Sequence, residues 1–160
     1  MYLALPQENA DEFTYLHSSQ EEGDFFLSIF IESFNVDASQ VDAKAGLMIR
    51  EFLGPDSRHA FIYVDGTGQT GFSTRDSAGQ LNKEHQEGSP SYPKDFKRGE
   101  LRLKRIDNVV TGYVRAAEKE EWLSIGPIQV GFDSFFVGIA VTSSHPNMAT
   151  FEFRDIVSSL

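Results

Sequence analysis

Apolar and polar positions alternate along most of this chain with the period of a β-strand. The segments DFFLSIFIESF, KAGLMIREF and SFFVGIAVTSS (residues 24–34, 44–52 and 134–144) are rich in β-branched and aromatic residues, and turn-forming residues bound each of them. None has the three-and-four spacing of an amphipathic helix. The pattern therefore predicts strands of antiparallel sheet.

The same alternation predicts about ten strands. Their expected ranges are Tyr2–Leu5, Glu12–Leu16, Asp24–Phe34, Lys44–Phe52, Arg58–Asp65, Gln69–Asp76, Gly99–Ile106, Val109–Ala117, a pair at Glu121–Ile125 and Pro127–Val130, Ser134–Ser144 and Met148–Val157.

Turn residues punctuate these strands at the expected places. Gly54–Ser57 predicts a β-turn with proline in the second position, Gly66–Gly68 a hairpin loop, and Asp107–Asn108 a tight turn. Between Ser77 and Arg98 the alternation stops, which predicts a long loop. Many short strands separated by regular turns imply two packed sheets, and the long strands favour the curved sheets of a jelly roll.

The composition supports one domain with a substantial core. The chain has 160 residues, of which 14 are phenylalanine, and this apolar mass suits a single sandwich domain over residues 1–160. The formal net charge of −10 disfavours nucleic acid and anionic membrane as partners and suits calcium or neutral ligands such as glycans. The chain has no cysteine, so it has neither disulfides nor thiolate chemistry.

The N-terminal sequence has neither a basic leader nor a long apolar run, so no signal peptide or membrane span is predicted there. Two localisations fit this observation. The protein is either cytoplasmic or a module excised from a longer secreted protein.

Several segments occur in an order that resembles a known family. In chain order they read KAGLMIREFLGPDSRHAFIYV, GFSTRDSAG, GELRLKRIDNVVTGYV, EWLSIG, VGIAVTSS and ATFEFRDI. This set is similar to the concanavalin A-like lectin/glucanase sandwich domains of the regulation-of-enolase type, a family largely without assigned function. The resemblance covers roughly Tyr2 to Ile156 and implies two antiparallel sheets with one concave face, where a glycan would bind. The charged insertion Leu81–Arg98 departs from the family pattern.

Alternation places five candidate ligand-binding residues, and the long loop adds a sixth, Tyr92. Arg50 lies opposite in parity to Ala45, Leu47 and Ile49, so if those three residues form the core, Arg50 lies on the open face of its sheet. Arg75 would share that face, and two guanidinium groups there could hold sugar hydroxyls or a carboxylate. Aromatic faces beside planar polar groups are what sugar binding needs. The complete candidate set is Arg50, His59, Tyr63, Arg75, Tyr92 and Tyr113.

Each candidate also has a purely structural interpretation. The two arginines could pair with Glu51, Asp65, Asp76 or Glu152 and simply cover the sheet. Phe61 and Tyr63 could pack across strands, and Trp122, the only tryptophan, is typical of a packing anchor.

No catalytic motif is visible. Glycosidic cleavage needs two facing carboxyl groups, and the chain lacks the E-x-D-x-x-E strand motif of glucanases on this scaffold. The four histidines lack zinc-binding spacing, and no serine lies in a G-x-S-x-G elbow. We expect no cofactor, although aspartates near the turns leave a structural calcium possible.

Two functions of different class therefore remain open, with an enzyme third. The first is a non-catalytic module that binds a glycan on the concave face. The second is a protein-interaction or regulatory module that uses the loop Leu81–Arg98 or a sheet edge. The sequence predicts no oligomeric state.

Overall fold

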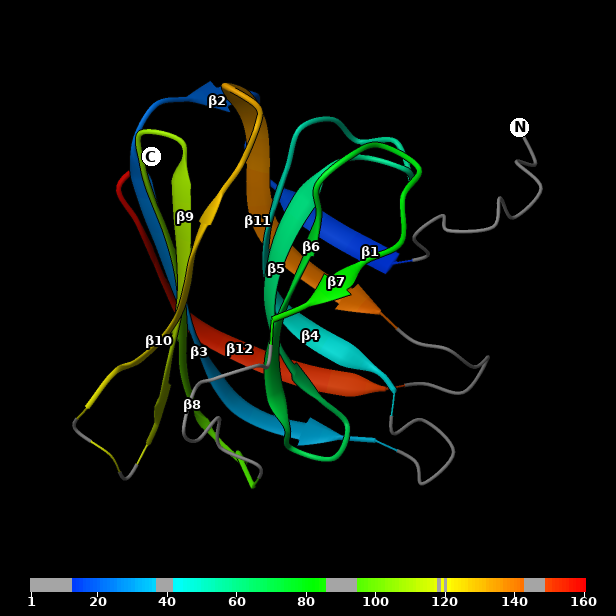
Figure 1. Cartoon of the computed structure of the whole chain (residues 1–160). Helices are drawn as coiled ribbons and strands as arrows, with labels where there is room; N and C mark the ends of the chain where they lie inside the picture. Colours follow the sequence, from blue (N-terminus) through cyan, green and yellow to red (C-terminus); the bar gives the residue numbers. More distant parts are fainter. Residues whose placement is uncertain (1–12, 37–41, 86–94, 118, 120, 143–148) are drawn as a thin grey trace.

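The chain forms an all-β sandwich of two antiparallel sheets packed face to face (Figure 1). The computed structural model describes residues 13–36, 42–85, 95–117, 119, 121–142 and 149–160. This architecture confirms the predicted jelly-roll class. The described part of the chain holds no helix long and apolar enough to cross a membrane.

The larger sheet has seven strands. Its order is β1 (Phe13–His17), β11 (Ser134–Thr142), β4 (Lys44–Arg50), β5 (His59–Asp65), β6 (Thr70–Arg75) and β7 (Lys83–Glu84), with β2 (Glu21–Glu22) pairing to β11 off this path. Every strand pair in it is antiparallel.

The smaller sheet has five strands, and all its pairs are also antiparallel. Its order is β10 (Leu123–Gln129), β9 (Val109–Ala116), β8 (Gly99–Ile106), β3 (Phe25–Asn35) and β12 (Thr150–Ser158).

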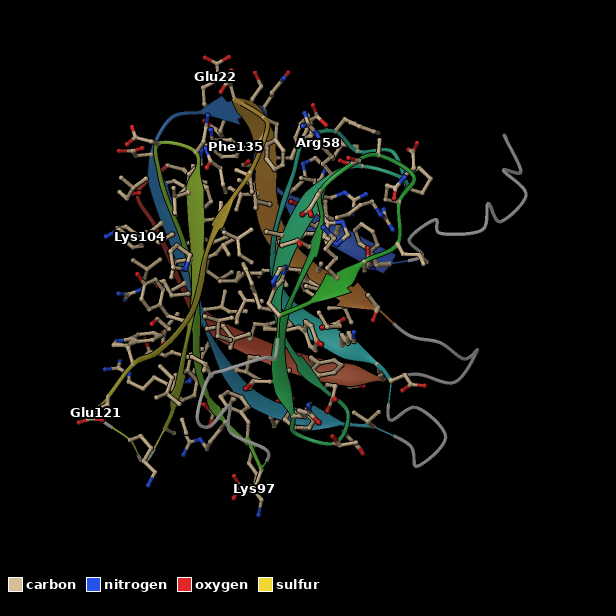
Figure 2. The ribbon with its side chains drawn as sticks, in the orientation of Figure 1. Glu22, Arg58, Lys97, Lys104, Glu121 and Phe135 are labelled. Carbon is tan, nitrogen blue, oxygen red and sulfur yellow. The ribbon has the colours of Figure 1, made fainter. Side chains whose placement is uncertain are left out.

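The main core fills the space between the two sheets. Leu47 and Ile49 of β4 point into it from one side, and Leu101 and Leu103 of β8 from the other, all with no exposed surface. Phe135 also points into the interior, where its ring centroid lies 5.0 Å from that of Phe25 (Figure 2). Because successive side chains of a strand point to opposite faces, the apolar positions of each alternating segment face the core and the polar positions face outward.

The predicted turns form as expected. The amide of Ser57 donates to the carbonyl of Gly54 at 3.2 Å, which closes the proline turn. In the next hairpin the amides of Thr67 and Gln69 both donate to the Asp65 carboxylate, at 2.8 and 3.0 Å. Asp107 has φ +52°, as its tight turn requires.

Two predicted elements differ in the structure. The two strands expected at Glu121–Ile125 and Pro127–Val130 are one strand, β10, because a bulge beside Gly126–Pro127 lets the pairing with β9 continue. Within the predicted long loop, β7 pairs with β6. The strand expected at Tyr2–Leu5 lies outside the described residues.

Candidate functional site

The face of the seven-stranded sheet that points away from the main core is the predicted binding face. Along this face, Arg50 is the register partner of His59, and His59 is the partner of Arg75, so the three residues form one row across β4, β5 and β6. Met48, Phe61 and Tyr63 occupy the neighbouring rows and form a second small cluster with Ala140. We call this surface the β4–β5 face. The prediction that Arg50 lies opposite the core residues Leu47 and Ile49 is confirmed.

The two arginines hold the loops at the rim of this face. Arg50 has no exposed surface, and its guanidinium donates to the carbonyl of Gly54 at 2.6 Å and to that of Phe52 at 3.4 Å. Arg75 is 3% exposed and donates to the carbonyls of Gln80 at 2.8 Å and Pro55 at 2.9 Å. Both side chains therefore satisfy main-chain acceptors of the β4–β5 and β6–β7 connections.

The carboxylates proposed as alternative partners for these arginines have other contacts of their own. Glu51 makes an ion pair with Arg58 at 2.5 Å, and Asp76 makes one with Lys83. The hydrogen bond from Arg58 lowers the pKa of Glu51, and that from Lys83 lowers the pKa of Asp76.

Tyr63 joins a polar cluster at the far end of the β4–β5 face. Its hydroxyl donates to Glu84 at 2.6 Å, and the Lys44 ammonium lies 4.2 Å from the centroid of its ring. Lys44 also donates to Glu84 at 3.2 Å, and the side chains of these two charged residues are 31% and 40% exposed. The Tyr63 ring covers Gly71, where an added Cβ would lie 2.4 Å from the tyrosine hydroxyl. Glycine at this position therefore makes room for the ring.

Aromatic rings line the β1 side of the same face. Phe13, Tyr15 and His17 alternate on β1, with ring centroids 5.8 Å and then 5.1 Å apart. The ring of Phe136 stands edge-on to His17 at 5.3 Å. The side chains of Phe13, Tyr15 and Phe136 are half-buried, and that of His17 is exposed. Phe13 also covers the Arg50 guanidinium, at 4.7 Å from the ring centroid. We call these four rings the aromatic strip.

Tyr15 anchors the aromatic strip to the sheet. Its hydroxyl reaches the carbonyls of Met48, at 2.9 Å, and of Phe136, at 3.0 Å. Burial raises the pKa of Tyr15, and the Arg50 charge opposes that shift only in part.

The six predicted ligand-binding residues do not all meet on this face. Arg50, His59, Tyr63 and Arg75 lie together on it, and each is 3% exposed or less. Tyr113 does not, because β9 belongs to the five-stranded sheet and turns this side chain to the opposite side of the sandwich. Tyr92 lies outside the described residues. Whether the four residues that do meet contact a ligand stays a prediction.

Sequence reasoning missed the residues of this face that have exposed polar or aromatic surface. Lys44 and Glu84 are 40 positions apart, and the pairing of β6 with the two-residue strand β7 brings Glu84 beside Tyr63. No local pattern marks so short a strand. The aromatic strip did leave a signal, since Phe13, Tyr15 and His17 alternate in FTYLH.

A small pocket opens where the ends of β5 and β6 meet the β10–β11 connection. Its volume is about 40 Å³. That is room for roughly two or three water molecules and too little for a sugar ring. Its walls include Arg58, His59, Arg75, Asp76 and Gly131.

No group of three or more metal-binding side chains occurs among the described residues. The sequence left a structural calcium open on aspartates near the turns, namely Asp24, Asp42, Asp56, Asp65 and Asp133, and these residues are distributed over separate turns. Asp65, for example, is occupied by the hydroxyl of Thr67 at 2.6 Å as well as by main-chain amides.

Comparison with known proteins identifies the fold. No protein-family model matches the chain, and no curated protein matches it. Solved structures do. A xylan β-1,4-xylosidase from Bacillus halodurans C-125 superposes with a TM-score of 0.65 at 16% identity, over 92% of this chain and 30% of that chain.

Two further structures share the sandwich. A functionally unknown protein from Saccharomyces cerevisiae has a TM-score of 0.60 at 15% identity, over 93% of this chain and 75% of its own. The alginate lyase from Klebsiella pneumoniae has a TM-score of 0.57 at 11% identity, over 86% of this chain and 60% of its own. At these identities the likeness establishes the two-sheet β-sandwich fold alone. This chain spans under a third of the xylosidase.

Proposed function

We propose that this protein is a non-catalytic carbohydrate-binding module that engages a glycan on the β4–β5 face. Two of the structures that share its fold are named for activity on polysaccharides, the xylosidase and the alginate lyase. We also propose, from the ordered segments quoted in the sequence analysis, that the chain is related to the sandwich domains of the regulation-of-enolase type.

The observation that carries the proposal is the pairing of rings with a partly exposed polar cluster on one face. The aromatic strip offers partly or fully exposed rings on which the C–H faces of a sugar could stack. The Lys44–Tyr63–Glu84 cluster offers a carboxylate and an ammonium group that already hold each other in place. Preorganised polar groups of this kind bind hydroxyls without a large ordering cost.

In this proposal the buried arginines position the rim of the site. Arg50 and Arg75 hold the main chain of the flanking loops, and His59 lies between them. The rings of Phe13 and Tyr15 are supported from below by the Arg50 guanidinium and by the hydroxyl contacts of Tyr15.

The charges around this face favour binding over hydrolysis. A glycosidase needs a carboxyl group whose pKa is raised so that it can donate a proton. Near the rim of the β4–β5 face, the pKa values of Glu51 and Asp76 move the other way, because basic side chains bond to both. Glu84 is likewise bonded to Tyr63 and Lys44.

Affinity electrophoresis tests the assignment of this face. Retardation of the protein in gels that contain neutral plant and microbial polysaccharides identifies a ligand. We expect Glu84→Gln to reduce that retardation about tenfold or more, since a charge-assisted hydrogen bond is worth about 1.5–3 kcal/mol.

Glu51→Gln is the matched control, because Glu51 is also an ion-paired glutamate of similar exposure, 30%, but its partner Arg58 belongs neither to the aromatic strip nor to the Lys44–Tyr63–Glu84 cluster. Its retardation should equal that of the native protein. Equal retardation of native protein and Glu84→Gln would remove the site from the β4–β5 face.

A protein-interaction module is the second candidate, and one observation favours it. The edge strand β12 exposes apolar side chains, with Ile156 at 57% and Val157 at 51%, and Leu160 follows at 50%. Exposed apolar groups on an edge strand are typical of surfaces that pair with another chain. Failure to bind any polysaccharide, together with capture of a partner that is lost in Val157→Lys, would support this function.

A further inference from the structure

The outer face of the five-stranded sheet combines cations and rings in a second constellation. Along β8 the apolar residues Leu101 and Leu103 point into the core, so Arg102 and Lys104 point outward. Figure 2 shows Lys104 directed away from the sandwich on this side. Tyr113 of β9 is the register partner of Arg102, and Ser124 of β10 is the partner of Tyr113. We call this surface the β8–β9 face.

Trp122 organises this face. The guanidinium carbon of Arg102 lies 4.5 Å from the Trp122 ring centroid, and that of Arg115 lies 4.6 Å from it. Tyr113 stands edge-on to the same ring at 6.4 Å, and Phe26 lies 5.6 Å from Arg102. Arg102 is therefore held between two rings by cation–π contacts, which fix its plane and remove part of its hydration.

Most cations on this face have an acidic partner. Arg98 pairs with Glu32 at 3.0 Å, and Arg154 pairs with Glu32 at 2.6 Å. Arg115 bonds to Glu100.

Arg102 and Lys104 are different. Neither makes an ion pair in the part of the chain that the structure describes, and the Nε atom of Arg102 is buried without a hydrogen-bond partner. The two residues are two positions apart on one strand, which separates them by about 7 Å. A chain with net charge −10 has acidic residues in excess, so two unpaired neighbouring cations are an unusual arrangement for it.

We propose that the β8–β9 face is a second binding site, for the carboxylate of an acidic sugar. Arg102 offers a planar, oriented donor pair for a carboxylate, and Lys104 adds a second charge beside it. Tyr113 and Ser124 place hydroxyl groups across the neighbouring strands, where the hydroxyls of the sugar would lie. This site is on the opposite side of the sandwich from the β4–β5 face and does not depend on it.

The net charge of the chain favours an acidic sugar over a nucleic acid. A polyphosphate gains most of its affinity from many cations acting together, whereas this site offers two neighbouring cations, Arg102 and Lys104, on a molecule whose net charge of −10 repels phosphate. A uronate residue needs one oriented carboxylate contact and several hydroxyl contacts.

Trp122 is the only tryptophan and provides a direct reporter for this site. The experiment is a titration of the full chain with tri-galacturonate, with the neutral galactose trisaccharide and with a hexaglutamate peptide, followed by Trp122 fluorescence. We expect a saturable change with tri-galacturonate that weakens as NaCl is added, and none with the neutral sugar.

Variants on the same face sharpen the test. Arg102→Gln should weaken tri-galacturonate binding at least tenfold, while Arg98→Gln, which removes a cation already paired with Glu32, should leave it within twofold. No response of the native protein to tri-galacturonate, an equal response to the neutral sugar, or unchanged affinity in Arg102→Gln would overturn the proposal. Saturation by hexaglutamate alone would also overturn it and would indicate an acidic protein partner instead.

Discussion

Arg50 is a buried charge that holds the loop at the rim of the β4–β5 face. Its guanidinium is fully buried, yet its donors meet carbonyls of the β4–β5 loop and its flat side lies against Phe13. Leaving the buried guanidinium without these acceptors would cost several kcal/mol of folding free energy. The position of Arg50 and the positions of the loop carbonyls therefore depend on each other. If Arg50→Ala abolished glycan binding, two explanations would fit equally well. The variant could have lost a direct contact between Arg50 and the glycan, or the loops at the rim of the face could have collapsed.

Tyr15 gives a pH-dependent prediction at the same scale. Burial raises its pKa above the ordinary value of 10.0, so the folded protein keeps the phenol neutral where the unfolded chain ionises it. The stability that Tyr15 contributes is fully present below its unfolded pKa of 10.0, and it is lost progressively above that value as the pH rises toward the raised pKa of the folded state. We expect urea midpoints to stay level up to about pH 9 and to keep falling above about pH 10.

Tyr15→Phe is the control for that titration. It removes the hydroxyl and its hydrogen bonds to Met48 and Phe136, at a cost of about 1 kcal/mol at neutral pH, and it should flatten the alkaline decline. An equal decline in native protein and variant would assign the effect to other groups.

Strand β1 is the element on which the proposed glycan site most depends, because it supplies three rings of the aromatic strip. Its pairing with β11 needs a close approach at Gly138, where an added Cβ would lie 2.0 Å from the carbonyl oxygen of Leu16. The amide of Ser18 extends the pairing by donating to Val137 at 2.9 Å.

Gly138→Ala should therefore loosen β1 from the sheet. We expect a loss of about 1–3 kcal/mol in unfolding free energy, and faster hydrogen exchange at the β1 amides than elsewhere. Gly131→Ala is the matched control, because its added Cβ would meet only the end of the flexible Arg58 side chain, at 2.8 Å. Unchanged exchange at β1 in Gly138→Ala would show that the strand adapts to the extra methyl group.

The strands were predictable from the sequence because each alternates over several residues. Gly99–Ile106 has the same bounds in prediction and structure, and the hairpin at Asp107–Asn108 follows from its turn residues. Two elements were not predictable. The strand β7 is only two residues long, and the bulge in β10 depends on pairing with β9.

The candidate site was predictable only in part. The face on which Arg50 lies was predicted correctly, because the alternation of side chains along β4 depends only on neighbouring residues of that strand. Parity cannot say which sheet a strand joins, so Tyr113 was assigned to the wrong face. Burial of Arg50 and Arg75 depends on loop carbonyls that no strand pattern reveals.

At the scale of the whole molecule, the two sheets present outer faces of different chemistry. The β4–β5 face combines an aromatic strip with a cluster in which lysine, tyrosine and glutamate satisfy one another. The β8–β9 face carries guanidinium groups stacked on Trp122. In the two proposals above, each of these faces holds part of a carbohydrate ligand. The lowered pKa values of Glu51 and Asp76 near the β4–β5 rim fit that binding role better than acid catalysis, because basic side chains bond to both carboxyl groups.

A glycan array probed with the 160-residue chain, with and without a calcium chelator, tests the central claim most directly. We predict reproducible binding to at least one class of glycan, and loss of that binding with chelator would add a calcium ion to the site. A blank array under both conditions would contradict a carbohydrate-binding role and leave the protein-interaction module as the account of this fold.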